Sequence, residues 1–240
     1  MIKAILFDKD GTLIEFNSLW INSTYAMIHE LVNMYADHNH DEKSNEISLL
    51  VGLNGINVSE HSVLASKSTE DISGISAQQL GVEHKLIHEK VNQFYYDYVS
   101  ERRNEIKGIG NLVPLFQQLK SKQLAIGVVT ADNYDITALT LNKLGINKYV
   151  DFIATADRYK KKPDIEAMQA FCNLFNIEKE EVVHIGDTLV DMEFSKHGKY
   201  GVGVLSGVGT EETLRKYTSY ILPSVQELID EHGNLILRDL

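Results

Sequence analysis

The chain has 240 residues, 43% of them hydrophobic, and its 34 acidic residues outnumber 23 lysines and arginines to give a net charge of −11. This length supports one large core, or a core with a smaller companion domain. The acidic balance excludes a general affinity for nucleic acid or anionic membrane, because either partner needs a dominant basic face. The single cysteine, Cys172, excludes an internal disulfide, and its apolar surroundings predict a core residue.

The N-terminus, MIKAILFD, runs directly into an apolar strand pattern without a basic leader or an apolar stretch of signal length. No window approaches the roughly 18 apolar residues that a membrane span needs. We therefore expect a cytoplasmic protein without a membrane partner. The oligomeric state is not predicted.

Short apolar runs rich in β-branched residues predict five buried strands, and helical patterns lie between most of them. The predicted strands are KAILFD (3–8), AIGVVT (125–130), DFIATA (151–156), VVHIGD (182–187) and YGVGVL (200–205). The helical patterns are NLVPLFQQLKSK (111–122), YDITALTLNKLG (134–145) and IEAMQAFCNLF (165–175). This alternation predicts an α/β fold with a doubly wound, Rossmann-like parallel sheet.

One long interval after the first strand lacks any convincing buried strand. It contains two amphipathic helical patterns, SLWINSTYAMIHELVNMYA (18–36) and HKLIHEKVNQFYYDYVSERR (84–103). We therefore predict an inserted α-helical cap domain over residues 17–105. Residues 1–16 and 106–240 then form the α/β core domain.

The first motif whose side chains could take part in a reaction is FDKDGTL, residues 7–13. In a strand, side chains alternate, so Asp8 and Asp10 are expected on one side while Lys9 points away. Gly11 allows a sharp turn, and Thr12 can hydrogen-bond within it. Two carboxylates would then meet at the carboxyl end of the strand, where open α/β sheets bind ligands. Alone, the pattern could be a plain acidic turn.

The second motif is HIGDTLVDM, residues 184–192. Asp187 ends a predicted strand and Asp191 follows four residues later, which places both on one side of a helix that starts there. In isolation, a helix cap with a first-turn acid would explain the pair. Parallel strands, however, would bring both acidic motifs to one edge of the sheet. Such carboxylates repel one another unless a hard cation is present, and oxygen ligands suit Mg²⁺.

Two further segments fit the same chemistry. VVTAD, residues 128–132, ends a predicted strand, so the Thr130 hydroxyl and the following backbone amide at Ala131 could cradle a phosphate. RYKKKPD, residues 158–164, is typical of a solvated loop when considered alone. Acids, a cation, a hydroxyl and a lysine together suit phosphoryl transfer through an aspartyl phosphate.

The ordered motifs FDKDGT, VVT, KKKPD and IGDTLVD, with a helical insertion after the first, resemble the haloacid dehalogenase superfamily. The resemblance is strongest to its capped phosphatases of the phosphoglycolate phosphatase and β-phosphoglucomutase kind, and it covers essentially the whole chain. It implies Asp8 as nucleophile, Asp10 as general acid and base, and Thr130 with Ala131 as phosphate binders. It also implies Mg²⁺ held by Asp8, the Asp10 backbone carbonyl and Asp187, with Asp191 in support.

Family members usually carry K-P-x-P-D in the third motif, and this chain departs from that pattern. Counting back from Asp164 selects Lys160, whereas counting from the proline selects Lys162, with Lys161 between them. We predict Lys160 as the catalytic and phosphate-binding lysine, because the spacing to the following helix should govern its reach. Lys9 also departs from the family, since it fills a slot that is usually apolar.

The resemblance implies a cap that closes over the site and reads the leaving group. The candidate contacts are GLNGIN (52–57), HSVLASK (61–67) and Arg102 or Arg103. The implied function is Mg²⁺-dependent hydrolysis of a small phosphorylated metabolite, as in phosphoglycolate phosphatase. Phosphoglycolate, a sugar phosphate, a nucleotide monophosphate and pyridoxal phosphate all stay open as substrates. A sugar phosphomutase would share the core residues, and a non-catalytic regulatory protein would be expected to lack Asp8 or Asp10.

Overall fold

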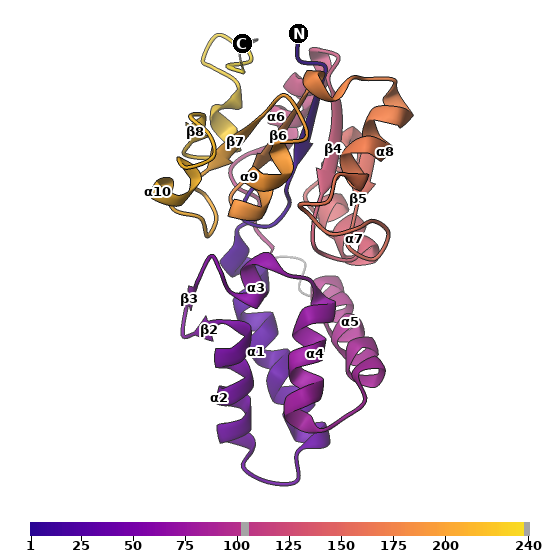
Figure 1. Cartoon of the computed structure of the whole chain (residues 1–240), viewed down its shortest axis with the longest axis vertical. Coiled ribbons are helices and arrows are strands. Elements are labelled where there is room, and N and C mark those ends of the chain that lie inside the picture. The colour runs from indigo at the N-terminus through magenta and orange to yellow at the C-terminus, as the bar shows by residue number, and fades with distance from the viewer. Residues whose placement is uncertain (102–105, 238–240) are drawn as a thin grey trace. The chain divides into compact units, whose positions relative to one another are not determined.

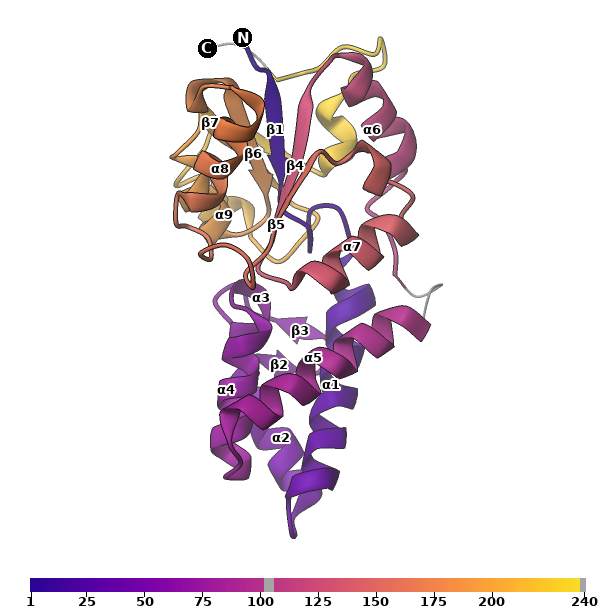
Figure 2. The same cartoon turned by 90° about the vertical axis from the view of Figure 1, so that its right-hand side faces the viewer.

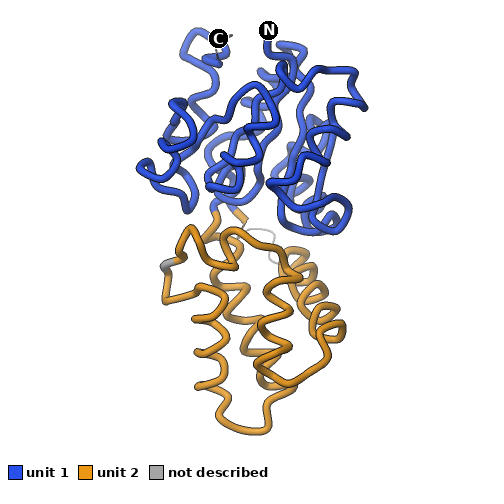
Figure 3. The backbone as a smooth tube through the Cα atoms, in the orientation of Figure 1, with its two compact units in different colours: residues 1–15, 107–240 blue, residues 16–106 orange. Residues whose placement is uncertain are grey.

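The chain folds into two compact units. The computed structural model describes residues 1–101 and 106–237. Unit 1 comprises Met1–Glu15 and Lys107–Leu240, and unit 2 comprises Phe16–Ile106 (Figure 3). Each border lies one residue from the border predicted from the sequence. Arg102 and Arg103, two of the candidate cap contacts, lie outside the described residues.

Unit 1 is built on a six-stranded parallel sheet with the strand order β5-β4-β1-β6-β7-β8 (Figure 1). The strands are β1 (Ala4–Phe7), β4 (Ala125–Val129), β5 (Phe152–Ala154), β6 (Val182–Gly186), β7 (Tyr200–Val204) and β8 (Ile221–Leu222). The doubly wound α/β prediction is confirmed. Of these six strands, β8 alone is not predicted from the sequence, because two residues are too few to show a periodic pattern.

The chain reverses its direction of travel across the sheet at β1. It moves from β1 to β4 and β5 on one side, and then returns to β6 on the other. In this sheet Phe7 of β1 lies opposite both Val128 of β4 and Ile185 of β6. The three strands therefore end nearly level, and the residues that follow them share one edge at a topological switch point.

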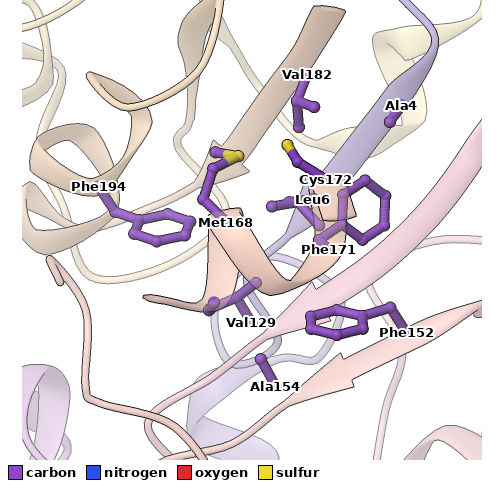
Figure 4. Packing of buried hydrophobic residues seen from close by; sticks show 11 residues of the cluster. Ala4, Leu6, Val129, Phe152, Ala154, Met168, Phe171, Cys172, Val182 and Phe194 are labelled. Carbon is purple, nitrogen blue, oxygen red and sulfur yellow. The ribbon is translucent and has the colours of Figure 1, made fainter. Parts of the chain in front are cut away.

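Helices cover both faces of the sheet. Alternate residues of β1 point to opposite faces, so neighbouring residues pack against different helices. Leu6 belongs to a buried cluster with residues of α8 (Glu166–Phe175) and α9 (Leu189–Ser195) (Figure 4). Phe7 stacks instead on Phe116 of α6 (Leu112–Ser121), with ring centroids 5.4 Å apart. Figure 2 shows α8 and α6 on opposite sides of the strands. The core thus consists of two apolar layers.

Phe171 is the residue of α8 whose loss should cost the most stability. Its buried ring contacts Phe152 of β5 edge-on, with centroids 5.5 Å apart. We expect Phe171→Ala to lower the free energy of unfolding by about 3–5 kcal/mol, since the deletion leaves a cavity in a packed core. Urea denaturation followed by circular dichroism measures this. Leu174→Ala, on the same helix but 64% exposed, is the control and should change it by less than about 0.5 kcal/mol. Equal losses in both variants would contradict the packing described.

Unit 2 is helical apart from one short hairpin, β2 (Leu53–Asn54) with β3 (Asn57–Val58). Its helices are α1 (Phe16–Tyr35), α2 (His40–Val51), α3 (Val63–Ser66), α4 (Thr69–Leu80) and α5 (His84–Glu101). Helices α1 and α5 meet through Trp20 and Tyr95, whose rings are 5.0 Å apart, and Tyr95 and Tyr98 lie on the buried face of α5. Among the described residues, no helix combines the length and the apolar character that crossing a bilayer requires.

Candidate active site

Three buried carboxylates converge where β1 and β6 end. Asp8 follows β1, Asp187 follows β6, and Asp191 lies in the first turn of α9. One carboxylate oxygen from each lies within 4.8 Å of the others. Parallel pairing explains the convergence, since β1 and β6 end level with each other. The sequence prediction placed these three side chains at one edge, and the structure brings them together there.

Asp187 is enclosed by the turn after β1 and by the loop after β7. Thr12 donates its hydroxyl to Oδ1 at 3.1 Å, and the backbone amide of Val208 donates to Oδ2 at 2.9 Å. A Cβ atom at Gly207 would lie 1.9 Å from Oδ2, and one at Gly11, whose φ is +81°, would lie 2.5 Å away. Both loops can approach the carboxylate this closely only because glycine stands at these positions.

Asp191 bonds through one carboxylate oxygen to the start of α9 and through the other to Lys162 and His184. Its Oδ2 accepts hydrogen bonds from the amide and the hydroxyl of Thr188, the N-cap of α9, at 3.1 and 2.6 Å. Its Oδ1 accepts from His184 at 2.9 Å and from Lys162 at 2.5 Å. These four bonds use the roughly four lone-pair positions of a carboxylate. Asp191 therefore supports its neighbours more readily than it could bind a metal directly.

Lys162 is the lysine of RYKKKPD that reaches the carboxylates. Its Nζ lies 2.6 Å from Oδ1 of Asp8, and its side chain is only 7% exposed. The side chain of Lys160 is 71% exposed and points toward Asp164, with Nζ 3.9 Å from Oδ2. The prediction that Lys160 occupies this position is therefore wrong.

The reason lies in how the loop between β5 and α8 is held. The carbonyl of Pro163, directly after Lys162, accepts a hydrogen bond from His197 at 2.9 Å, which ties this point of the loop to the segment that follows α9. The backbone amide of Lys160 instead donates to Glu166 at 2.7 Å, on the exposed side of the loop. The proline is thus a better landmark for the lysine than the distance to the aspartate.

The carboxylates of the cluster repel one another, and Lys162 partly offsets this repulsion. Burial, together with the neighbouring Asp191, raises the pKa of Asp8 to about 7 against the lowering effect of Lys162. Burial and the charges of Asp8 and Asp191 raise the pKa of Asp187 well above its ordinary value. Burial would also raise the pKa of Asp191, but Lys162 and His184 hold it below the usual range. The cluster therefore favours an additional positive charge.

Asp10 lies beside this cluster and faces a different partner. Its carboxylate is 2.7 Å from Nζ of Lys9, which in turn lies 3.2 Å from Oδ2 of Asp132. Strand β1 ends at Phe7, so side-chain alternation no longer holds beyond it. The prediction that Lys9 points away from Asp10 is wrong for this reason.

Thr130 and Ala131 follow β4 at the same edge of the sheet. Thr130 is 5% exposed, and its hydroxyl oxygen accepts the backbone amide of Asp132 at 3.2 Å. Its own amide donates to the carbonyl of Ala154 at 3.0 Å. Ala131 is half-buried. Their role as phosphate binders stays a prediction, as does the metal-binding carbonyl of Asp10.

Four residues of the site region have contacts that were not predicted from the sequence: Lys9, Thr12, Asp132 and His184. His184 is the clearest case, because it is a polar residue in a strand of five that are all buried. A buried polar side chain needs a hydrogen-bond partner, and this one uses Asp191. That rule could have identified His184 and Lys9 as partners of the acidic motifs.

The sequence matches the family model of the haloacid dehalogenase-like hydrolases over residues 2–198. The pyrophosphatase PpaX of Bacillus velezensis is 26% identical over 242 residues, which cover 97% of each chain. Solved structures of the same fold include a β-phosphoglucomutase from Clostridium difficile, with a TM-score of 0.66, 21% identity, and coverage of 97% of this chain and 95% of that one. A predicted phosphoglycolate phosphatase from Haemophilus somnus gives a TM-score of 0.67 at 14% identity, covering 95% and 96%.

Proposed function

This chain belongs to the haloacid dehalogenase-like hydrolases and is a phosphatase, and on that premise we propose that it hydrolyses a small phosphorylated metabolite by way of a phosphorylated Asp8. The observation that carries the proposal is the contact of Lys162 with both Asp8 and Asp191, beside Asp187. A buried ammonium at the nucleophile can neutralise the charge of an incoming phosphate. Without it, three carboxylates would repel an anionic substrate.

We propose Mg²⁺ as the cofactor, held by Asp8 and Asp187 with the Asp10 carbonyl. The donor set fits, because it consists of oxygen atoms, and the raised pKa values of Asp8 and Asp187 reflect a need for positive charge. Hydrogen bonds from the Thr12 hydroxyl and the Val208 amide fix the orientation of the Asp187 carboxylate and leave it lone pairs for a cation. Bound there, the cation would neutralise negative charge on the phosphoryl group.

The residues of the site then act in sequence. The Asp8 carboxylate attacks phosphorus while Asp10 gives a proton to the leaving oxygen, so that an acyl phosphate forms as the P–O ester bond breaks. Asp10, now a carboxylate, takes a proton from water as that water attacks the phosphoaspartate and releases phosphate. Thr130 holds phosphate oxygens, and Lys162 balances their charge. Asp191 and His184 keep Lys162 in place.

Mg²⁺ should raise the thermal stability of the protein as well as its activity. A ligand that binds only the folded state at 100 times its Kd adds about 2.7 kcal/mol of stability. We expect differential scanning fluorimetry to show a rise in melting temperature with Mg²⁺, and EDTA to abolish both this rise and the release of phosphate from p-nitrophenyl phosphate. Asp187→Asn should lose most of the rise. An equal rise in this variant would argue against the proposed ligand set.

The substrate class has two candidates. A small phosphomonoester of the phosphoglycolate kind follows from the resemblance of the motifs, and pyrophosphate is favoured by the name of the Bacillus velezensis relative. A panel of about a hundred phosphorylated metabolites that includes pyrophosphate would rank them by kcat/KM. Sugar phosphates in the same panel, assayed for both phosphate release and isomer formation, would separate a phosphatase from a phosphomutase.

A further inference from the structure

Lys9 is a fully buried lysine that the proposed reaction does not use. Its side chain has 0% exposure, and its Nζ lies 2.7 Å from the Asp10 carboxylate and 3.2 Å from Oδ2 of Asp132. Two carboxylates thus flank the ammonium, and at least one of them must be ionised to neutralise a cation that has been removed from water.

The three side chains form a row that runs inward from the site. Asp10 is 16% exposed, whereas Lys9 and Asp132 are 0% and 1% exposed, so the pair lies behind Asp10. Asp132 is itself held firmly: its Oδ1 accepts the amide of Asn133 at 2.7 Å, and its own amide donates to Thr130 at 3.2 Å. The row thus connects Asp10 at the end of β1 to the loop that follows β4.

We propose that Lys9 is a positioning residue, which, anchored by Asp132, holds the Asp10 carboxylate in the orientation that proton transfer to the leaving group requires. The inference rests on the proposed role of Asp10. A carboxylate on the turn after β1 could otherwise rotate about its side-chain torsions toward solvent. An ammonium that cannot move restricts this rotation, and a catalytic group held in one orientation loses less entropy when it reacts.

The test compares two substrates that differ in their leaving group. Phenyl phosphate needs a proton on its departing oxygen, whereas p-nitrophenyl phosphate leaves readily without one. We expect Lys9→Met to lower kcat/KM by about 100-fold for phenyl phosphate and by less than about fivefold for p-nitrophenyl phosphate, because a misoriented Asp10 would protonate the leaving oxygen poorly. A purely structural role for Lys9 would lower both by the same factor, and equal losses would overturn the proposal.

Lys120→Met is the matched control. Lys120 forms an ion pair with Asp151 at 2.7 Å elsewhere in unit 1. Its loss should change kcat/KM for both substrates by one common factor of less than about two, because partly exposed pairs contribute little. Where Lys9→Met does not fold, the double variant Lys9→Met/Asp132→Asn is assayed instead. It leaves no buried charge without a partner and should show the same selective loss.

Asp10→Asn separates the two proposals. If this variant loses activity equally on both substrates, the proton-donating role of Asp10 fails and the proposed function needs revision. If Asp10→Asn loses phenyl phosphate hydrolysis selectively and the Lys9 variants do not, only the positioning role of Lys9 is overturned. Selective loss in both sets supports both proposals.

Discussion

Asp8→Asn should abolish turnover, with kcat for p-nitrophenyl phosphate reduced by at least about 10³-fold, a loss typical of removing a covalent nucleophile. An amide cannot attack phosphorus, and Asp191, which also contacts Lys162, already accepts hydrogen bonds from Thr188 and His184. Steady-state assays at saturating Mg²⁺ measure the loss. Rapid quenching followed by mass spectrometry should detect a transient phosphorylated form in the wild-type protein and none in the variant.

The variant also changes the charge of the cluster, so its fold must be checked. Replacing a buried carboxylate whose pKa is raised removes repulsion with Asp191, and we expect a melting temperature no lower than that of the wild type. Asp135→Asn, at an exposed position in the first turn of α7 (Tyr134–Lys143), is the matched control and should keep full activity. Retained activity in a folded Asp8→Asn protein would refute the proposed mechanism.

Lys162→Ala should lower kcat by about 10²–10³-fold, the effect of losing one preorganised charge at a reacting centre. The same replacement at Lys160 should leave kcat within about threefold, because an exposed lysine contributes little there. Lys161→Ala should behave like Lys160→Ala. Assays of phosphate release from p-nitrophenyl phosphate compare the three variants directly.

Removal of Lys162 also leaves Asp8 and Asp191 without their counter-charge. Breaking a buried pair in this way costs about 3–5 kcal/mol of stability, so activities should be normalised to the folded fraction measured by circular dichroism. Lys162→Met keeps the apolar length of the side chain and gives an independent estimate of the loss in kcat caused by removing the charge. A loss confined to Lys160→Ala would show that this loop adopts a different register in the working enzyme.

Much of the site could be predicted because parallel strands leave few arrangements for the residues that follow them. Once FDKDGTL and HIGDTLVDM are placed at strand ends, the pairing of β1 with β6 brings Asp8 and Asp187 together without further information. The fold class follows from the same alternation of strand and helix. These predictions depend on periodic patterns that a single sequence displays.

The other features of the site depend on contacts between side chains and loops, which a periodic pattern of apolar residues does not reveal. The direction of Lys162 is set by loop hydrogen bonds, such as that between His197 and Pro163, which join residues 34 positions apart. Lys9 departs from the prediction because side-chain alternation ends with the last residue of β1. Helices α2 and α4 were not identified, since their buried positions include Ser48, Ser73 and Ser76, which weaken the apolar pattern.

The bonding of Asp191 limits how an inactive form of this enzyme can be engineered. The same carboxylate starts helix α9 through Thr188 and holds Lys162 through its other oxygen. Replacing it would remove the N3 half of the capping box of α9 together with a partner of the lysine. An inactive protein produced this way would be a poor substrate trap, because its defects in folding and in chemistry could not be separated. A trap that keeps the native shape should be made at Asp8 or Asp10.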